Sequence, residues 1–255
     1  MYFKIKNIRI FVASLAYFIV LNTADKAFAS SNWDDVRFKN LDPDHKYVIA
    51  SGTGFFVNSD SIITNRHVVE KCESIAIRGY NYEPAHANIL AYDENEDLAA
   101  LKADVPNRKY AILRDNLSEL RVGDNIYSIG YPLGRAESGL YILKQANIID
   151  IKNIEATEDA EIIFTDSVDH GNSGGPILDL GGNIVGVVRA KASFVRYDNT
   201  EFNASIGVST KALMKFLESK NIPYTKRNTY DLVKNYSPDF DAKNYTVNIH
   251  CIRKK

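Results

Sequence analysis

The segment Gly171-Asn172-Ser173-Gly174-Gly175-Pro176 is the most informative part of this 255-residue sequence. A serine hydroxyl is a weak nucleophile unless a neighbouring base accepts its proton. An attacking serine also needs backbone N–H groups directed at the oxyanion that develops. Glycines on both sides of Ser173 allow a sharp turn and a close approach to a substrate, because no Cβ stands in the way. The hexapeptide therefore predicts a nucleophilic serine, and the simpler interpretation is a glycine-rich turn.

A nucleophilic serine requires a base, and the sequence contains five histidines. His67 lies in the segment Ile62–Val69, where an apolar strand runs into a polar turn. This places its imidazole at a strand end, where a site can form on a rigid scaffold. His170 comes too shortly before Ser173 to serve as its base, although it could line the same cleft. We expect structural or surface roles for the remaining three, His45, His86 and His250.

The residue that orients the base should be a carboxylate beside apolar sequence, because it is buried against the imidazole Nδ1–H. Asp97 stands directly before an apolar stretch and meets this requirement, and Asp93 is the reserve candidate. The acidic residues 93–97 also resemble the start of a calcium-binding loop. That interpretation fails, because the sixth position is Leu98 instead of glycine and the twelfth is Asp104 instead of glutamate.

The distribution of apolar residues favours an all-β fold. These residues make up 45% of the chain, and between about 46 and 207 they form short segments separated by Gly, Pro, Asn and Asp turns. No alternation of strands with helices of the length that a parallel sheet needs is visible, so an antiparallel barrel or sandwich is expected. One helix is predicted over 209–221. It has a cap at Ser209 or Thr210 and an apolar stripe of Leu213, Phe216 and Leu217.

Several motifs follow one another in the order and spacing of bacterial trypsin-like peptidases. They are Thr53–Val57, Thr64–Val69, Asp97–Leu101, Ser128–Pro132 and Gly171–Pro176. Over about residues 46–222 the chain resembles the protease domain of the Deg/HtrA group, with some similarity to the V8-like branch.

This resemblance implies two six-stranded antiparallel barrels, at about 46–120 and 121–208, with the C-terminal helix after them and a site in the cleft between them. It implies that His67 and Asp97 come from the first barrel and Ser173 from the second. The backbone N–H groups of Gly171 and Ser173 would form the oxyanion hole. The expected activity is that of a serine endopeptidase, which hydrolyses proteins or peptides through an acyl-enzyme on Ser173 and needs no cofactor and no metal.

Two features depart from better-known members of the family. Digestive trypsin-like enzymes carry an aspartate directly before the serine, which pairs with a new N-terminal amine, whereas this chain has Asn172. Activation by such an ion pair is therefore not expected. The Deg/HtrA group usually continues into a PDZ domain, and the roughly 30 residues after the helix are too few for one.

The resemblance also suggests a specificity pocket. It places Ser167 at the base of the pocket and Ala190 and Val208 on its walls, which predicts a small or medium apolar side chain before the cleaved bond. An uncharged residue at 167 argues against a requirement for Lys or Arg. The absence of histidine from the segment 186–189 argues against cleavage after Glu.

Two other classes of protein were weighed. An α/β-hydrolase also carries Gly-x-Ser-x-Gly, but its histidine follows the serine, and the only histidine after Ser173 is His250. A catalytically inactive trypsin-like fold that acts as a protein-binding or chaperone-like module stays open as an alternative. The formal net charge of -1 gives no electrostatic footprint for nucleic acid.

Residues 1–29 have the features of a cleavable signal peptide. Lys4, Lys6 and Arg9 precede the apolar run 10–21, and Ala27-Phe28-Ala29 offers a small-x-small cleavage site. The apolar run is too short to cross a bilayer core of about 30 Å, which argues against a membrane anchor. We expect a periplasmic or secreted protein with no stable membrane span after cleavage. Residues 30–45 are expected to form an N-terminal lead before the peptidase domain.

Export gives the two cysteines, Cys72 and Cys251, an oxidising environment in which they either form a disulfide or remain buried free thiols. Alternating apolar residues in the C-terminal tail, 223–255, predict a final strand. Because Cys251 lies on the apolar side of this strand, we expect residues 245–252 to fold back onto the first barrel and Cys251 to bond to Cys72.

Overall fold

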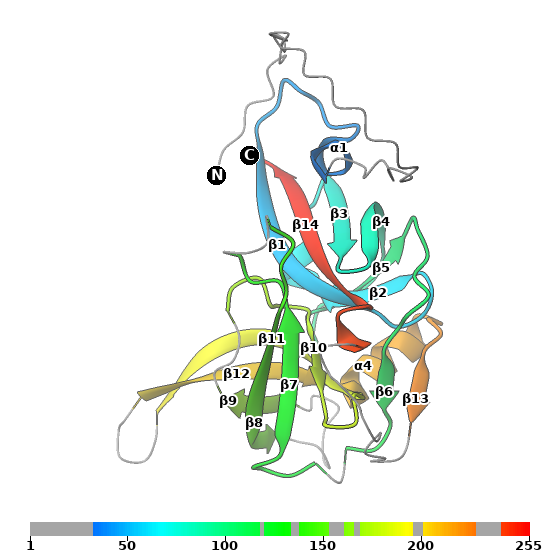
Figure 1. Ribbon diagram of the computed structural model, residues 1–255. Coiled ribbons are helices and arrows are strands. Elements are labelled where there is room, and N and C mark those ends of the chain that lie inside the picture. The colour runs from blue at the N-terminus through cyan, green and yellow to red at the C-terminus, as the bar shows by residue number, and fades with distance from the viewer. Residues whose placement is uncertain are drawn as a thin grey trace, which may run out of the picture.

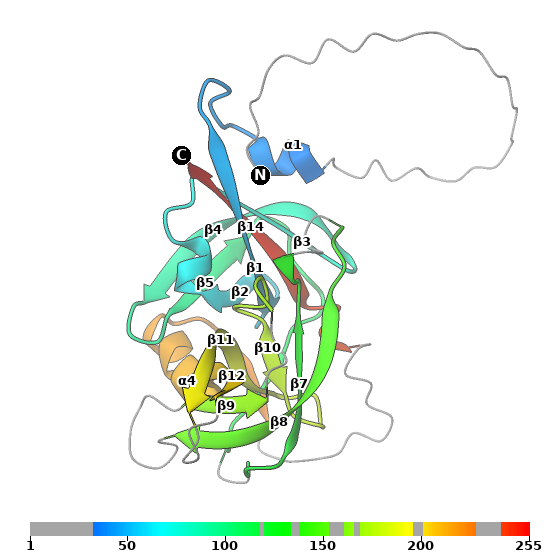
Figure 2. The ribbon, with the colours of Figure 1, turned by 90° about the vertical axis from the view of Figure 1, so that its left-hand side faces the viewer.

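The structure, a computed structural model, describes residues 33–117, 120–133, 138–152, 161–165, 169–195, 201–227 and 241–255. These residues form two β-barrels, one above the other in Figure 1 and again in the view turned by 90° in Figure 2. The prediction of two six-stranded antiparallel barrels is confirmed. The signal peptide expected at residues 1–29 lies outside the described residues.

The first barrel is a closed sheet in which every neighbouring pair of strands is antiparallel. Buried aliphatic and aromatic side chains, among them Phe56, Ile62 and Leu101, fill its interior. In the order of the sheet, its strands are β1 (Tyr47–Phe56), β14 (Thr246–Lys254), β3 (Ser74–Gly79), β4 (Tyr82–Asp93), β5 (Leu98–Ala103) and β2 (Ser61–Asn65).

The strand β14 comes from the C-terminal end of the chain and lies between β1 and β3. Figure 1 shows it in red beside the blue β1, and the two pair from Tyr47 with Lys254 to Phe55 with Thr246. Residues 46–120 thus supply five strands, and β14 completes the barrel. The segment 223–255, expected as a tail beyond the peptidase domain, therefore contributes a structural part of the first barrel.

The second barrel consists of antiparallel strands that close through the pairings of β10 with both β7 and β11. Two short strands, β6 (Ile112–Arg114) and β13 (Thr225–Arg227), extend this sheet beyond β11 through parallel pairings. In the order of the barrel, its strands are β10 (Pro176–Leu178), β7 (Asn125–Gly130), β8 (Ile142–Lys152), β9 (Glu161–Thr165), β12 (Glu201–Ser209) and β11 (Ile184–Val195).

The barrels are accompanied by the helices α1 (Trp33–Phe38), α2 (Arg66–Val69) and α4 (Thr210–Ser219). The predicted C-terminal helix is α4, in which the hydroxyl of Ser209 accepts a hydrogen bond from the N–H of Ala212 and the predicted apolar stripe is buried. The helix α1 contributes Val36 to a small apolar cluster with Tyr47, Ala76 and Ile252 on the outside of the first barrel. No helix in the described ranges is long and apolar enough to cross a bilayer.

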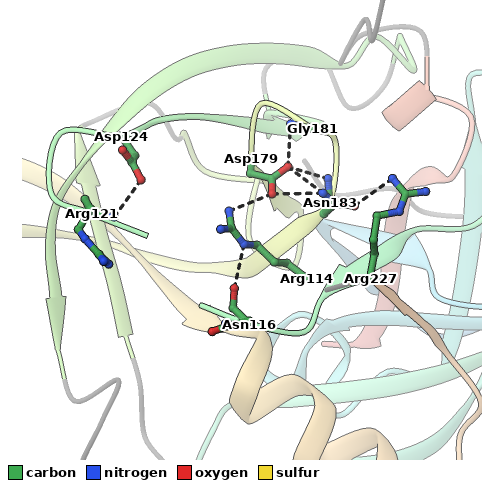
Figure 3. Close-up of polar contacts among 8 residues, drawn as sticks. All are labelled: Arg114, Asn116, Arg121, Asp124, Asp179, Gly181, Asn183 and Arg227. Carbon is green, nitrogen blue, oxygen red and sulfur yellow. Dashed lines mark hydrogen bonds and ion pairs between the residues drawn. The ribbon is translucent and has the colours of Figure 1, made fainter. Parts of the chain in front are cut away.

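A buried ion pair fixes β6 to the loop between β10 and β11. Arg114 Nη1 lies 3.2 Å from Asp179 Oδ2, and both side chains are only 2% exposed. Figure 3 shows that Asp179 also accepts hydrogen bonds from the N–H groups of Gly181 and Asn183, while Arg114 Nε donates to the carbonyl of Asn116. A buried charge is tolerated when it is paired and hydrogen-bonded in this way.

Candidate active site

A cavity of about 1180 Å³ is lined by residues of both barrels. His67 and Asp97 reach it from the first barrel, and Ser173 reaches it from the second. The structure therefore brings together the three residues that the sequence analysis singled out, although they lie far apart in the chain. Sites between two rigid units are common places for ligands to bind.

His67 is held at the end of a fully buried strand. All five residues of β2 are buried, and α2 begins directly after it, so that His67 stands in the first turn beyond the core. Its ring Nδ1 lies 2.6 Å from Asp97 Oδ2, and its backbone N–H donates to Asp97 Oδ1 at 3.0 Å. An ionised carboxylate can only accept hydrogen bonds. In a neutral imidazole this contact assigns the hydrogen to Nδ1, and Nε2 is left as an acceptor.

Asp97 is placed by its own backbone as well as by its side chain. Its φ of 54° lies in the left-handed region, which aspartate tolerates better than most residues. The carbonyl of Asp97 accepts hydrogen bonds from the Arg66 N–H at 2.9 Å and from the Asn65 side-chain amide at 3.1 Å. The reserve candidate Asp93 instead accepts from the N–H groups of its own turn. Asp97 is thus the carboxylate that faces His67.

Ser173 lies in the turn before β10, with its side chain lining the cavity. Its hydroxyl makes one hydrogen bond within the described residues, a long one of 3.4 Å to the carbonyl of Arg189. No hydrogen bond between Ser173 and His67 is present among these residues. A resting site often has loose contacts of this kind, which tighten when a substrate binds.

The backbone around Gly171 leaves two N–H groups unused. Neither Gly171 nor Ser173 donates its N–H to any group in the described ranges. Gly171 has a φ of 99°, and a Cβ at this position would lie 2.5 Å from the Tyr131 carbonyl. The carbonyl of His170 accepts from the Leu133 N–H at 2.6 Å. Only glycine fits here, and the two N–H groups remain available to a ligand beside Ser173.

The three residues expected to form the specificity pocket differ in their position relative to the cavity. Ala190 lines the cavity, while Ser167 lies outside the described residues. Val208 does not line the cavity: it is 1% exposed, packs in the core and pairs with Val187 across β11 and β12. Its expected place in the pocket wall does not fit this geometry, because alternation puts Val208 and its partner Val187 on the strand face opposite to Val188, which lines the cavity.

Further side chains also line the cavity. Leu133 and Ile142 give the cavity apolar surface, and His170 lines it as expected for a residue so close to Ser173. Asp169 lies at 2.9 Å from Lys144 Nζ, and the hydrogen bond from this lysine holds the pKa of the Asp169 carboxyl below its usual value. The sequence analysis did not single out a strand at β8, and nothing in it indicated that the first residue of this strand, Ile142, would face a cavity.

The C-terminal strand supports the segment that carries His67. A disulfide joins Cys72 to Cys251, with the two Cα atoms 5.2 Å apart. The guanidinium of Arg253 donates to the carbonyls of His67 at 3.0 Å and Val68 at 3.3 Å. Alternation along a strand puts Cys251 and Arg253 on the same face. Arg253 was not found from sequence, because its partners are backbone atoms far away in the chain.

The remaining histidines are structural or lie on the surface. His250 is 1% exposed and lies against the ring of Trp33, with Arg37 Nη1 at 3.3 Å from its Nδ1. Burial, and secondarily the charge of Arg37, lowers the pKa of His250 to about 3. His45 is exposed, and its Nδ1 lies 2.8 Å from Asp42 Oδ2. In the described part of the chain, no group of three or more His, Cys, Asp or Glu side chains could hold a metal ion.

The chain matches the family of the trypsin-like peptidase domain over residues 52–187, a range that contains His67, Asp97 and Ser173, and it belongs to this family. The serine protease Do-like HtrB of Bacillus subtilis is 35% identical over 150 residues, which are 56% of this chain and 33% of that protein. The DegP-like probable periplasmic serine endoprotease of Bartonella henselae is 36% identical over 159 residues, 61% of this chain and 31% of that protein. The expected similarity to the HtrA group is thereby confirmed.

Solved structures share the double-barrel fold. The active form of the Rv3671c protease from M. tuberculosis has a TM-score of 0.53 and 23% identity over 70% of this chain and 75% of that one. The HtrA-type protease AlgW with decapeptide has a TM-score of 0.55 and 22% identity over 67% of this chain and 51% of that one. The chain spans about a third of the length of the two curated relatives.

Proposed function

We propose that this protein is an exported serine endopeptidase, with Ser173 as nucleophile, His67 as general base and Asp97 as the residue that orients the base. The observation that carries the proposal is the pair of hydrogen bonds from His67 to Asp97, beside a serine that lines the same cavity. Membership of the trypsin-like peptidase family supports it.

In the proposed reaction, Ser173 Oγ attacks the carbonyl carbon of a peptide bond while His67 Nε2 accepts the hydroxyl proton. The N–H groups of Gly171 and Ser173 bind the oxyanion of the tetrahedral intermediate. When this intermediate collapses, the imidazolium gives its proton to the leaving amine, and an ester on Ser173 remains. Water then attacks the ester with His67 again as base, which releases the acid and restores the serine.

Asp97 has two roles in this proposal. It keeps the hydrogen on Nδ1 of His67, so that Nε2 faces the serine as an acceptor. It also stabilises the imidazolium that forms during each half of the reaction, because the carboxylate oxygen lies only 2.6 Å from Nδ1. The second hydrogen bond, from the His67 backbone, prevents the imidazole and the carboxylate from moving independently.

The proposed substrates are unfolded proteins or peptides with a small or medium apolar residue before the cleaved bond. Ala190, Ile142 and Leu133 give the cavity an apolar lining that suits such a side chain. Besides His67 and Asp97, the charged side chains Asp169, Arg189 and Lys191 line the cavity. Asp169 is paired with Lys144, and Arg189 is paired with Glu161. This pairing reduces their ability to select a charged substrate.

Export is proposed from the features of residues 1–29 and is supported by the disulfide between Cys72 and Cys251, which suits an oxidising compartment. The relative from Bartonella henselae carries a name that places it in the periplasm. Periplasm and external medium are both consistent with a cleaved signal peptide.

The proposal is tested by casein hydrolysis with the purified mature protein. We expect measurable hydrolysis that EDTA leaves unchanged, and a loss of kcat of about 10⁴–10⁶ for Ser173→Ala or His67→Ala with KM nearly unchanged. If the protein binds unfolded chains but cleaves none, and both variants bind equally well, the proposal is wrong. The protein-binding or chaperone-like alternative would then explain the fold.

A further inference from the structure

A single buried residue of the first barrel contacts the segment that carries Ser173 at two points, once through its backbone and once through its side chain. Thr53, in β1, is 0% exposed. Its backbone N–H donates to the carbonyl of Ser173 at 2.9 Å, and its hydroxyl donates to the carbonyl of Gly171 at 2.7 Å. The same hydroxyl oxygen accepts from the N–H of Tyr131 at 2.9 Å. A threonine hydroxyl has only one hydrogen to donate, and here it is directed at Gly171.

These contacts matter because Gly171 has no side chain to restrict its backbone. Glycine adopts positive and negative φ with similar ease. In this structure the carbonyls of two consecutive residues are fixed: Leu133 N–H holds that of His170, and the Thr53 hydroxyl holds that of Gly171. Tyr131, whose N–H also contacts the hydroxyl, stands two residues before Leu133. The orientation of the Gly171 N–H therefore depends on one connected set of hydrogen bonds.

We propose that the hydroxyl of Thr53 is a positioning group for the oxyanion site. It acts through Gly171, by keeping this residue at the φ that leaves its N–H free for an oxyanion, and it does not itself contact the substrate. The inference rests on the proposed function. Without the hydroxyl, the Gly171 carbonyl loses its donor. The peptide group after Gly171 is then held only by the hydrogen bond from the Asn172 N–H to Asp169, while Leu133 still holds the peptide group before it.

A second buried threonine provides a matched control. Thr246, in β14, is 1% exposed, and its hydroxyl donates to the carbonyl of Ala242 at 2.7 Å. At either position, the change of threonine to valine replaces a buried hydroxyl by a methyl group and nearly keeps the shape of the side chain. An effect that comes only from the loss of a buried hydrogen bond should therefore appear in both variants, while an effect on the oxyanion site should appear only at Thr53.

The experiment compares Thr53→Val, Thr53→Ala, Thr53→Ser and Thr246→Val with the wild type. For Thr53→Val we expect kcat to fall about 10- to 100-fold with KM unchanged, which is less than the full loss of an oxyanion donor. Thr53→Ser keeps the hydroxyl and should recover most of the activity, and Thr246→Val should keep the wild-type kcat. Thr53→Ala gives the same comparison if valine at this position prevents folding.

A second measurement does not depend on catalysis. We expect hydrogen exchange of the Asn172 amide, which donates to the Asp169 carbonyl and not to Thr53, to become at least tenfold faster in Thr53→Val and to stay unchanged in Thr246→Val. A wild-type protein that hydrolyses nothing would end the proposed function, and the exchange rates would still decide whether Thr53 holds this segment. Two results would overturn the inference. One is a folded Thr53→Val or Thr53→Ala variant with the wild-type kcat and the wild-type exchange rate. The other is an equal loss of kcat in Thr53→Val and Thr246→Val.

Discussion

Replacing Cys72 and Cys251 by serine should weaken the first barrel and reduce the activity together. The disulfide joins the last strand of the chain to the segment directly after α2, which carries His67. The same strand supplies Arg253, whose guanidinium contacts the carbonyl of His67. The bond therefore links a strand that completes the barrel to the turn that presents the proposed base.

The expected magnitude follows from the length of the loop that the disulfide closes. The two cysteines are separated by 179 positions. In the chain-entropy model a loop of this length stabilises the folded state by about 5 kcal/mol. Native strain and residual structure in the unfolded chain lower this value, so we expect a loss of roughly 2–5 kcal/mol. For a protein of this size that corresponds to a decrease in Tm of roughly 5–15 °C.

The assay is thermal unfolding together with casein hydrolysis, for the wild type with and without reductant and for the double serine variant. We expect reduction and substitution to lower Tm equally, and kcat to fall several-fold at temperatures where the protein is folded. Arg253→Ala should lower kcat in the same direction with a smaller change in Tm, because it removes the contact to His67 and leaves the disulfide. If iodoacetamide modifies both cysteines in the unreduced native protein without denaturant, the bond is absent and the reasoning fails.

Three further predictions concern single sites. Asp97→Asn should lower kcat for casein hydrolysis by about 10⁴, because the imidazole would be held in the wrong tautomer. Asp93→Asn should keep a kcat near that of the wild type. The reverse result would show that Asp93, and not Asp97, orients the base. Burial lowers the pKa of His250 to about 3, whereas its value in an unfolded chain is about 6.5. Between these two pH values the unfolded state binds more protons than the folded state. The free energy of unfolding must therefore fall as the pH decreases through this range. Urea unfolding should show a loss of about 2 kcal/mol at pH 5 relative to pH 8, and His250→Gln should flatten this dependence. Asp179→Asn should cost about 3–5 kcal/mol in the same measurement, because Arg114 would keep a buried charge without its partner, and combining it with Arg114→Met should recover part of the loss.

Much of the fold and the central site could be predicted from the sequence. Short alternating segments specify strands, and glycine at 171 reflects a backbone position that no other residue fits. His67 and Asp97 stand at the ends of apolar strands, and for this reason the sequence analysis could select them. These features depend on residues that are close together in the sequence, and sequence patterns can therefore predict them.

The features that were missed depend on contacts between distant segments. Residues 245–252 were expected to fold back as a strand onto the first barrel, as β14 does, but which strands it would pair with, β1 and β3, follows from tertiary packing. The alternation of these residues also implied one exposed face, whereas His250 is buried because α1 covers the outside of the strand. Val208 was expected at the pocket wall from the family resemblance, but it lies on the strand face opposite to the cavity-lining Val188.

The central claim, that Ser173 is an activated nucleophile, is tested most directly by active-site labelling. The mature protein is treated with a fluorophosphonate, which phosphonylates an activated serine, and the modified residue is identified by peptide mass spectrometry. We expect one equivalent of label on Ser173 in the wild type, and little or none in His67→Ala. A folded wild-type protein that takes up no label, or that carries it on another serine, would contradict the proposed mechanism.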